Sequence, residues 1–428
     1  MNILLIGSGG REHAIAWKLR NSPSCKRLFA VPGNPGVFTV AEPANISTGD
    51  ANNVDIIAGF CQENKIELTV IGPEQPLADG LADDLRERGF AVFGPSRAAA
   101  QIEWSKGFAK EFMQQWNIPT ADFSRFTSYE EDAAVGYAEQ LVRKSGKAVI
   151  KADGLAAGKG VIIAELPKEA ADTVRDILGG MFGKAGASVV IEEFLQGEEA
   201  SIFAVSDGVR YVTLAPAQDH KRIGEGDTGK NTGGMGAYCP APIVTHDVLR
   251  RVCTEIIEPT LAGMSEQGTP FIGCLFIGLM ICDGAPKVVE FNSRFGDPET
   301  QAVLTVFEGD FARLLYSAAI GNLDFETASN TQNGYACNVV LASKGYPDAY
   351  GKGSVVTGIE RAEALGAYVF QAGTAEQNGE IVSAGGRVVG VCAHGTTLRD
   401  AVNLAYRAVD EIKFDGKTYR RDIAARAL

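Results

Sequence analysis

The stretch AVIKADGLAAGKGVIIA, residues 148–164, decides the fold, because two apolar strand-like segments enclose a run of small residues. The Walker spacing G-x-x-x-x-G-K-[ST] is not met, since Gly158 comes only four residues after the preceding glycine and a glycine follows Lys159. We therefore predict a hairpin between two strands and not a P-loop. Backbone N–H groups in such a turn can cover a triphosphate while Lys151 supplies a positive charge. A flexible, exposed hairpin without a ligand is the alternative.

The residues before this hairpin predict a sheet of another kind. Over residues 1–103, short apolar runs alternate with helical patterns, as in a doubly wound parallel sheet with helices on both faces. One helix is predicted over Leu77 to Arg88, and another over Gln101 to Trp116. Ligands bind such sheets at the carboxyl ends of the strands. Those ends carry Gly7 to Gly10, Pro32 to Asn34 and Gly72 to Glu74.

The first of these turns suits an anion but not a dinucleotide. Glu12 stands where the third glycine of G-x-G-x-x-G is required, and no acidic residue closes the second strand. Gly9 and Gly10 could still direct backbone N–H groups at a ribose phosphate, because a helix N-terminus attracts negative charge. A tight turn without a ligand is the alternative.

An acidic bend follows the next apolar strand along the chain. In VVIEEFLQGEE, residues 189–199, the strand runs into a polar bend that could present free backbone groups to a purine edge. Glu199 is the candidate for binding the two ribose hydroxyls. A solvated surface turn is the alternative reading of these acids.

A candidate metal site lies in KVVEFNSRFGDPET, residues 287–300. The period of two in a strand places Glu290 and Asn292 on one face, with Val289 and Phe291 in the core. Two oxygen ligands on one face suit a magnesium ion that also bridges ATP phosphates. Arg294 suits a clamp on a carboxylate or phosphate. An ordinary half-buried strand shows the same alternation, so that reading stays open.

A long polar loop is predicted between Ala217 and Tyr238. It contains Asp219, His220 and Lys221, and a glycine-rich run from Asn231 to Gly236. Loops of this length are usually functional lids or disordered insertions. His220 could serve in acid–base chemistry, and a solvated loop histidine is the alternative.

The rest of the chain predicts further strands and helices. We expect a helix over Thr245 to Met264 and paired strands over Phe271 to Ile281 and Pro286 to Asn292. From about residue 328 the pattern is one of short strands followed by a helix over Thr397 to Glu411.

Composition limits the classes of function. The chain has 428 residues, 45% of them hydrophobic, which is typical of a globular protein. Its 53 acidic and 40 basic residues give a net charge of -13, which disfavours nucleic acid and anionic membranes as partners. Eight cysteines without a C-x-x-C pair predict free, buried thiols in a reducing compartment. With no signal peptide and no apolar run of about 20 residues, we expect a soluble cytoplasmic protein.

Seven motifs in order resemble those of the phosphoribosylamine-glycine ligase family, in the ATP-grasp superfamily. They are GSGGREHA (7–14), GPEQPL (72–77), IKADGLAAGKGV (150–161), EEFLQGEEAS (192–201), QDHKR (218–222), NTGGMGAY (231–238) and EFNSRFGDPETQ (290–301). The resemblance covers essentially the whole chain. It implies an α/β and α+β multidomain fold with a doubly wound N-terminal sheet, ATP-grasp lobes and a small C-terminal mixed α/β domain. The implied bounds are 1–103 for the Rossmann-like substrate domain, 104–123 and 195–327 for the catalytic lobe, 124–194 for the nucleotide lid, and 328–428 for the C-terminal domain.

The resemblance also implies a reaction. ATP phosphorylates the carboxylate of glycine, and the amine of 5-phosphoribosylamine attacks the glycyl phosphate to give glycinamide ribonucleotide, ADP and phosphate. The implied cofactors are ATP, as co-substrate, and Mg²⁺ or Mn²⁺, and we expect a monomer. Another purine-pathway ATP-grasp ligase or carboxylase is one alternative. A catalytically silent nucleotide-binding module is the other.

Site residues follow from the same resemblance. It assigns the nucleotide to Lys106, Lys151, Gly158, Glu192, Glu193, Leu195 and Glu199, and the metal to Glu290 and Asn292. It assigns the substrates to Gly9, Gly10, Glu74, Asp219, Lys221, Asn231, Gly233 and Gly234. Arg294 and Asp297 fall in the reaction-centre run.

Three positions depart from the family pattern. Lys230 stands where the lid motif normally has proline, and Ala424 replaces a glycine near the C-terminus. The strand from Cys274 to Ile281 has no carboxylate, although several ATP-grasp relatives place a metal ligand there. Metal coordination is therefore expected to rely on phosphates and water as well.

Overall fold

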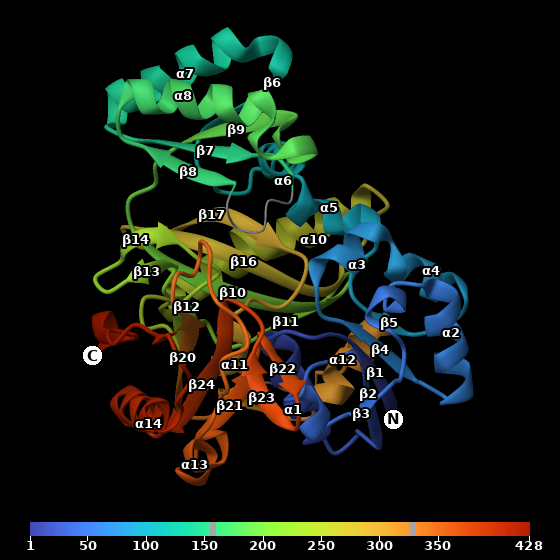
Figure 1. Cartoon of the computed structure of the whole chain (residues 1–428). Helices are drawn as coiled ribbons and strands as arrows, with labels where there is room; N and C mark the ends of the chain where they lie inside the picture. The colour runs from blue at the N-terminus through green and yellow to red at the C-terminus, as the bar shows by residue number, and fades with distance from the viewer. Residues whose placement is uncertain (155–159, 326–330) are drawn as a thin grey trace.

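A computed structural model describes residues 1–154, 160–325 and 331–428 of the chain (Figure 1). The N-terminal part is a parallel sheet of strand order β3-β2-β1-β4-β5, as predicted. Its strands are β1 (Asn2–Gly7), β2 (Arg27–Pro32), β3 (Glu42–Pro43), β4 (Leu68–Ile71) and β5 (Val92–Phe93). The helices that follow these strands are α1 (Gly10–Arg20), α2 (Val54–Glu63), α3 (Glu74–Asp79) and α4 (Leu81–Glu87).

Two predicted helices are each divided in the structure. The helix expected over Leu77 to Arg88 is α3 followed by α4, because Gly80 at φ 97° adopts the left-handed conformation that ends a helix. The helix expected over Gln101 to Trp116 is α5 (Arg97–Trp104) followed by α6 (Lys106–Gln115). Ser105 between them is extended, and its hydroxyl accepts the backbone N–H of Phe108 at 3.2 Å as the cap of α6.

A small lobe stands apart from the rest of the molecule (Figure 1). Its sheet has the order β6-β9-β7-β8 and is covered by α7 (Glu131–Ser145) and α8 (Pro167–Asp176). The strands are β6 (Phe123–Thr127), β7 (Ala148–Ala152), β8 (Val161–Ala164) and β9 (Ser188–Glu193). The predicted strands on either side of the glycine-rich run are β7 and β8, and they pair antiparallel. Gly158 in the turn lies outside the described residues.

A second lobe, which we name the catalytic lobe after its expected role, is built on an antiparallel sheet of order β11-β10-β16-β17. Its strands are β10 (Glu198–Asp207), β11 (Tyr211–Thr213), β16 (Ile272–Cys282) and β17 (Ala285–Asn292). The helix expected over Thr245 to Met264 consists of α9 (His246–Val252), a π-helical turn (Cys253–Ile257) and α10 (Glu258–Glu266).

The prediction that Val289 points to the core is wrong. Gly278 pairs with Glu290 and Leu279 with Val288, so Val289 is an extra residue in a β-bulge. The buried residues are Val288 and Phe291, while Val289 is half-buried like Glu290 and Asn292. Bulges of this kind redirect side chains and backbone groups next to functional sites.

The predicted loop from Ala217 to Tyr238 contains four short strands. They are β12 (Gln218–Asp219), β13 (Arg222–Gly224), β14 (Thr228–Asn231) and β15 (Gly236–Cys239). β13 and β14 form a hairpin, and β12 and β15 extend the C-terminal sheet. The segment is therefore part of the folded structure and not a disordered insertion.

The C-terminal sheet has the order β12-β15-β20-β24-β21. It comprises β20 (Tyr335–Ser343), β21 (Tyr368–Gln371) and β24 (Arg387–Gly395), and it packs against α14 (Leu398–Glu411) and α11 (Glu299–Val306). Smaller elements complete this half of the molecule: α12 (Phe311–Ala319), α13 (Ile359–Ala364), β18 (Phe307–Glu308), β19 (Thr331–Gln332), β22 (Thr374–Gln377), β23 (Glu380–Ser383) and β25 (Lys417–Thr418).

Two further sequence predictions can be compared with the fold. All eight cysteines are free thiols, and five of them are buried. Within residues 1–154, 160–325 and 331–428, no helix has the length and apolar character needed to cross a bilayer.

Candidate active site

A buried chain of charges links the small lobe to the catalytic lobe. Lys151 Nζ on β7 lies 2.8 Å from Glu192 Oε1 on β9 and donates to the backbone oxygen of Val289, the bulged residue, at 3.1 Å. Lys110 on α6, which the sequence did not single out, holds the other oxygen of Glu192 at 2.9 Å. Because both lysines engage the Glu192 carboxylate, this side chain is already paired within the protein.

Glu193 and Leu195 lie beside this chain of charges. Glu193 Oε1 accepts a hydrogen bond from Lys287 Nζ of β17 at 3.4 Å and another from the backbone N–H of Asp122 at 3.2 Å. Leu195 is half-buried in the bend after β9. These contacts place the predicted adenine segment at the boundary with the catalytic lobe.

Three lysines surround Glu290. Lys106 begins α6, and its Nζ donates to the backbone oxygen of Gly154 at 3.3 Å. Burial alone would raise the pKa of Glu290, but the charges of Lys221, Lys151 and Lys106 hold this pKa below its usual value. Burial lowers the pKa of Lys106, and the charge of Glu290 partly opposes this shift. Positive charge concentrated here suits a polyphosphate.

Glu290 and Asn292 fit a hard divalent cation. Both are half-buried on the same face of β17, and within the described residues neither side chain has a hydrogen-bond partner. Glu290 Oε1 lies 3.9 Å from Lys221 Nζ, which is beyond hydrogen-bond distance. In the described part of the chain, no three or more His, Cys, Asp or Glu side chains cluster so that they could hold a metal ion by themselves. Two oxygen ligands suit a divalent cation that also keeps several waters and binds substrate phosphates.

A second charged group lies between β10 and β12. Lys221 Nζ pairs with Glu199 Oε2 at 2.7 Å, and the two carboxylates of Glu199 and Asp219 raise the pKa of Lys221 against the effect of burial. Burial raises the pKa of Asp219 to about 8, with Lys221 opposing and Glu299 adding to the shift. The structure therefore brings together Glu199, Asp219, Lys221 and Glu290, from three separate motifs.

Arg294 connects the reaction-centre run to the N-terminal domain. Its guanidinium lies 3.0 Å from Glu103 Oε1 on α5 and 3.4 Å from Glu74 Oε2 at the start of α3. Glu103 also accepts the backbone N–H of Ser293 at 2.8 Å. Burial raises the pKa of Glu74, but Arg294 and then Arg11 bring it below its usual value. Glu103 and Arg11 are further polar residues that sequence reasoning missed, although Arg11 stands inside the GSGGREHA motif.

The Gly9–Gly10 turn is filled by protein groups. The N–H of Gly9 donates to Glu12 Oε2 at 2.6 Å, and Arg11 Nε donates to the other oxygen of Glu12 at 2.5 Å. A Cβ added to Gly10 would lie 3.1 Å from Ala372 Cβ of the C-terminal domain. A phosphate could reach the Gly9 amide only by displacing the Glu12 carboxylate.

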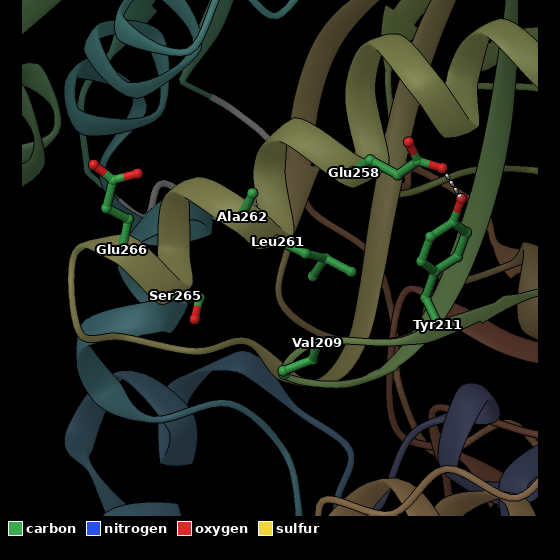
Figure 2. Close-up of a pocket in the computed structure, with 8 residues that line it drawn as sticks. Val209, Tyr211, Glu258, Leu261, Ala262, Ser265 and Glu266 are labelled. Carbon is green, nitrogen blue, oxygen red and sulfur yellow. Dashed lines mark hydrogen bonds between the residues drawn. The ribbon is translucent and has the colours of Figure 1, made fainter.

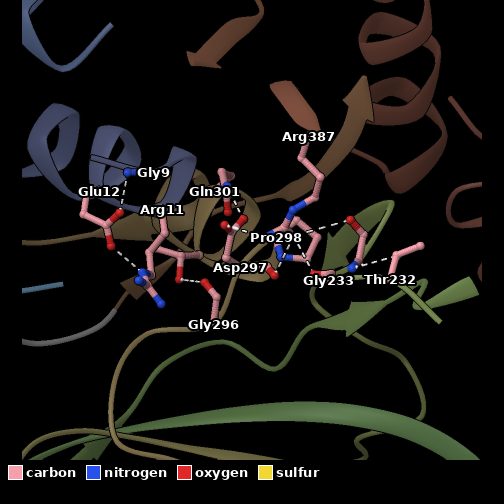
Figure 3. Close-up of polar contacts among 12 residues, drawn as sticks. Gly9, Arg11, Glu12, Thr232, Gly233, Gly296, Asp297, Pro298, Gln301 and Arg387 are labelled. Atoms are coloured by element: carbon pink, nitrogen blue, oxygen red, sulfur yellow. Dashed lines mark hydrogen bonds and ion pairs between the residues drawn. The ribbon is translucent and has the colours of Figure 1, made fainter. Parts of the chain in front are cut away.

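Asp297 and the Gly233–Gly234 turn lie together (Figure 3). Asp297 Oδ1 accepts from Gln301 Nε2 at 2.9 Å, and its backbone oxygen accepts from Arg387 Nη1 at 2.9 Å. Arg387 also donates to the carbonyl of Gly233 at 2.5 Å. Asn231 ends β14, paired with Arg222, and its side chain has no hydrogen bond within the described ranges.

His220 and a surface cavity remain to be compared with the predicted site. His220 is 2% exposed, and burial lowers its pKa to about 3, so it is a buried neutral histidine and not a solvated loop residue. A surface cavity of about 410 Å³ lies elsewhere, between α10 and the turn that joins β10 to β11 (Figure 2). None of the residues lining it is a predicted site residue.

The small lobe and the catalytic lobe meet at a lysine-rich boundary, next to Glu290 and Asn292 of β17. This arrangement of two lobes defines an ATP-grasp protein. The fold is shared with a biotin carboxylase crystal structure from Campylobacter jejuni, at a TM-score of 0.71 and 13% identity, covering 98% of this chain and 92% of that one.

Family models narrow this class further. The models of the N domain, the ATP-grasp (A) domain and the C domain of phosphoribosylglycinamide synthetase match residues 1–103, 104–300 and 336–426. The chain belongs to the phosphoribosylglycinamide synthetase family.

Individual relatives agree with this assignment. A phosphoribosylamine–glycine ligase from Mesorhizobium japonicum is 48% identical over 428 residues, covering 100% of this chain and 99% of the relative. One from Vibrio cholerae is 46% identical over 430 residues, with coverage of 100% and 99%. The crystal structure of the Thermotoga maritima phosphoribosylamine–glycine ligase superposes with a TM-score of 0.84 at 34% identity, covering 99% of this chain and 100% of that chain.

Proposed function

We propose that the chain uses ATP to join glycine to 5-phosphoribosylamine, giving glycinamide ribonucleotide, ADP and phosphate in purine biosynthesis. The observation that carries this proposal is the contact between Lys151 of the small lobe and β17 of the catalytic lobe, beside Glu290 and Asn292. A lysine that would bind phosphate and a candidate metal site thus lie next to each other. The full-length similarity to phosphoribosylamine–glycine ligases supports the choice of substrates.

The first step activates a carboxylate. A carboxylate oxygen of glycine attacks the γ-phosphorus of ATP, and ADP leaves with the electrons of the broken P–O bond. Lys106 and Lys151 would neutralise charge on the transferring group and hold the reactants in line. A divalent cation held by Glu290 and Asn292, magnesium or manganese, would supply further charge neutralisation on the phosphates.

The second step forms the amide bond. The amine of 5-phosphoribosylamine attacks the carbonyl carbon of glycyl phosphate, and phosphate leaves with the oxygen that came from glycine. Arg294, which pairs with Glu74 and Glu103, would bind the anionic acyl phosphate, because a guanidinium offers several parallel donors. Asp297, in the same run, would orient the attacking amine.

Nucleotide and substrate contacts are assigned to the neighbouring segments. The backbone of Glu192, Glu193 and Leu195 would bind the adenine, and Glu199, oriented by Lys221, the ribose hydroxyls. The glycine-rich turn that includes Gly158 would cover the phosphates. The sugar substrate would be bound by groups from the N-terminal domain and the β12–β15 segment, namely Gly9, Gly10, Glu74, Asp219, Lys221, Asn231, Gly233 and Gly234.

Isotope transfer tests the mechanism directly. With glycine carrying ¹⁸O in its carboxylate, one ¹⁸O atom should appear in each phosphate released, as measured by mass spectrometry. Continued release of ADP over many turnovers should require both glycine and 5-phosphoribosylamine. Release with bicarbonate or formate in place of glycine would favour another purine-pathway ligase or carboxylase. Tight ATP binding without turnover would favour a silent nucleotide-binding module.

The remaining expectations belong to the same proposal. We propose that residues 124–194 form the nucleotide lid on the catalytic lobe of residues 104–123 and 195–327, between domains at 1–103 and 328–428. The chain acts on small molecules only, as a monomer in the cytoplasm. Its net charge of -13 is consistent with the absence of a nucleic-acid or membrane partner.

A further inference from the structure

We propose that Arg387 of the C-terminal domain is a positioning residue for the ligation reaction, holding Asp297 and the Gly233–Gly234 turn in one fixed arrangement. The inference rests on the proposed function. It adds a residue outside the seven motifs and gives the C-terminal domain a role in the chemistry.

One guanidinium connects two segments that the proposed reaction needs. Arg387 Nη2 lies 2.9 Å from Asp297 Oδ2, and Nη1 donates to the backbone oxygen of Asp297 at 2.9 Å and to that of Gly233 at 2.5 Å. Arg387 begins β24 of the C-terminal sheet, whereas its acceptors belong to the catalytic lobe (Figure 3). A planar fork with five donors can make these bonds at once, and a lysine cannot.

The glycine turn is shaped around this guanidinium. A Cβ added to Gly233 would lie 3.0 Å from Arg387 Cζ, so the bare backbone is what lets the guanidinium approach. Gly234, at φ +105°, would place a Cβ 2.3 Å from Pro298 Cδ, next to Asp297. The N–H of Gly233 donates to the hydroxyl of Tyr346, also from the C-terminal domain, at 3.0 Å. The turn is therefore held on both sides by that domain.

Asp297 is fixed by donors from two elements. Gln301 of α11 binds one carboxylate oxygen and Arg387 binds the other. Burial would raise the pKa of Asp297, but Arg387, followed by Arg11 and Arg294, holds this pKa below its usual value. The buried Glu299 is an acidic neighbour of Asp297, and the charge of Asp297 helps to raise the Glu299 pKa. Removing Arg387 takes away the charge that lowers the Asp297 pKa most.

The test compares Arg387→Met and Arg387→Lys with Arg361→Met. Arg361 lies in the same domain and pairs with Glu411 at 2.9 Å on the surface, so its loss controls for the removal of any arginine ion pair. Steady-state rates with glycine, 5-phosphoribosylamine and ATP, the pH profile of kcat and thermal midpoints are measured on the full-length chain.

The expected pattern separates positioning from stability. Arg387→Met should lower kcat on the order of 10²-fold, as misplacement of a reacting group does, with the KM for ATP within about 3-fold of wild type. The acid limb of its pH profile should move to higher pH, because Asp297 loses its strongest partner. Guanidinium ion at millimolar concentration should restore part of the rate. The kcat of Arg387→Lys should lie between those of Arg387→Met and wild type, and the kcat of Arg361→Met should match that of wild type.

Several outcomes would overturn the inference. One is a kcat for Arg387→Met within about 3-fold of wild type. Another is a loss of rate without a shift of the acid limb and without rescue, since a structural contact alone would give this. If Arg387→Met does not fold, an Arg387→Lys enzyme with the wild-type rate would also overturn it. Failure of wild type to make glycinamide ribonucleotide would instead overturn the proposed function, and the inference with it.

Discussion

The catalytic lobe has two boundaries of opposite character. Toward the N- and C-terminal domains it shares one apolar core, in which Ile3 of β1, Phe203 of β10 and Phe370 of β21 belong to the same cluster. Toward the small lobe no such sharing is found among the described residues, because the small lobe has a core of its own that includes Ile150. Polar contacts cross this second boundary, such as those of Lys151 with Val289 and of Lys287 with Glu193.

The two boundaries should therefore differ in how easily they open. Apolar area stabilises a boundary by about 25 cal/mol per Å², so a shared core resists opening. A hydrogen bond exchanged with water contributes only about 0.5–1.5 kcal/mol net, so a polar boundary can open and close. The candidate nucleotide site lies at the polar boundary, and Arg294 and Asp297 are fixed from the apolar side. The polar boundary can thus open to admit a substrate while Arg294 and Asp297 stay in position.

The largest expected effect tests the polar boundary. Glu290→Ala removes the only carboxylate of the candidate metal pair, and we expect turnover to fall by at least about 10³-fold while the fold survives. Circular dichroism and ADP release would measure the two properties. Glu266→Ala, a change of the same type on α10, is the control expected to match wild type. A Glu290→Ala enzyme of normal rate would reject the metal assignment.

The next effect tests the shared core. Phe203 is fully buried and packs edge-on to Phe276, with ring centroids 5.3 Å apart. Phe203→Ala should lower the free energy of unfolding by about 3–5 kcal/mol. Hydrogen exchange followed by mass spectrometry should show faster exchange in the N-terminal, catalytic and C-terminal sheets together.

Ile150→Ala is the matched change in the small lobe. Ile150 is also fully buried, and its loss should cost about 2–5 kcal/mol. Here the faster exchange should stay within residues 123–193. Faster exchange throughout the molecule would contradict the separation of the two cores.

A smaller effect concerns pH and the apolar boundary. His13 Nδ1 accepts the backbone N–H of Gln371 at 2.9 Å, and burial lowers the His13 pKa to about 4. The unfolded chain therefore binds more protons between pH 6.5 and 4. This contribution to stability is complete above pH 6.5 and is lost as pH falls toward 4.

His13→Gln should weaken this dependence of stability on pH. The denaturation midpoint should fall less between about pH 7 and pH 5 than in wild type, because His13 no longer titrates. The exposed His246 provides the control, and His246→Gln should keep the wild-type dependence. An unchanged dependence in His13→Gln would show that other groups govern it.

The smallest expected effect concerns Lys230. Its Nζ pairs with Asp348 at 2.8 Å, but both side chains are exposed. Exposed pairs contribute little, so Lys230→Ala should change stability by less than about 1 kcal/mol and kcat by less than about 2-fold. A large loss of rate would mean that Lys230, which stands where the family normally has proline, does affect the nearby Gly233–Gly234 turn.

Local patterns made part of this molecule predictable. Alternating strand and helix patterns gave the parallel sheet, and the strands around the glycine-rich run formed the expected hairpin. Period-two alternation put Glu290 and Asn292 on one face, but it could not reveal the bulge, because the extra residue is defined by its partner strand. Capping by Ser105 and Gly80 divided two predicted helices, and both residues were visible as breakers.

Contacts between segments far apart in the chain could not be predicted from the sequence. The sequence around Lys110 is that of an ordinary helix, and only the packing of β9 brings Glu192 into contact with it. Glu103 binds Ser293, which lies 190 residues away in the chain. Arg387 opens an ordinary apolar strand, and only the packing of two domains places it on Asp297. Such residues carry no local signature, because tertiary structure alone creates their surroundings.

The bulge at Val289 makes β17 one residue longer than its ladder needs. Deleting a residue from a buried strand ordinarily turns every later side chain to the wrong face. Here a chain without Val289 would instead have Val288 followed directly by Glu290, in step with Leu279 and Gly278 opposite. The sheet would become more regular while the carbonyl that receives Lys151 disappeared. The extra residue therefore serves the contact with the small lobe, and a more regular strand would lack that contact.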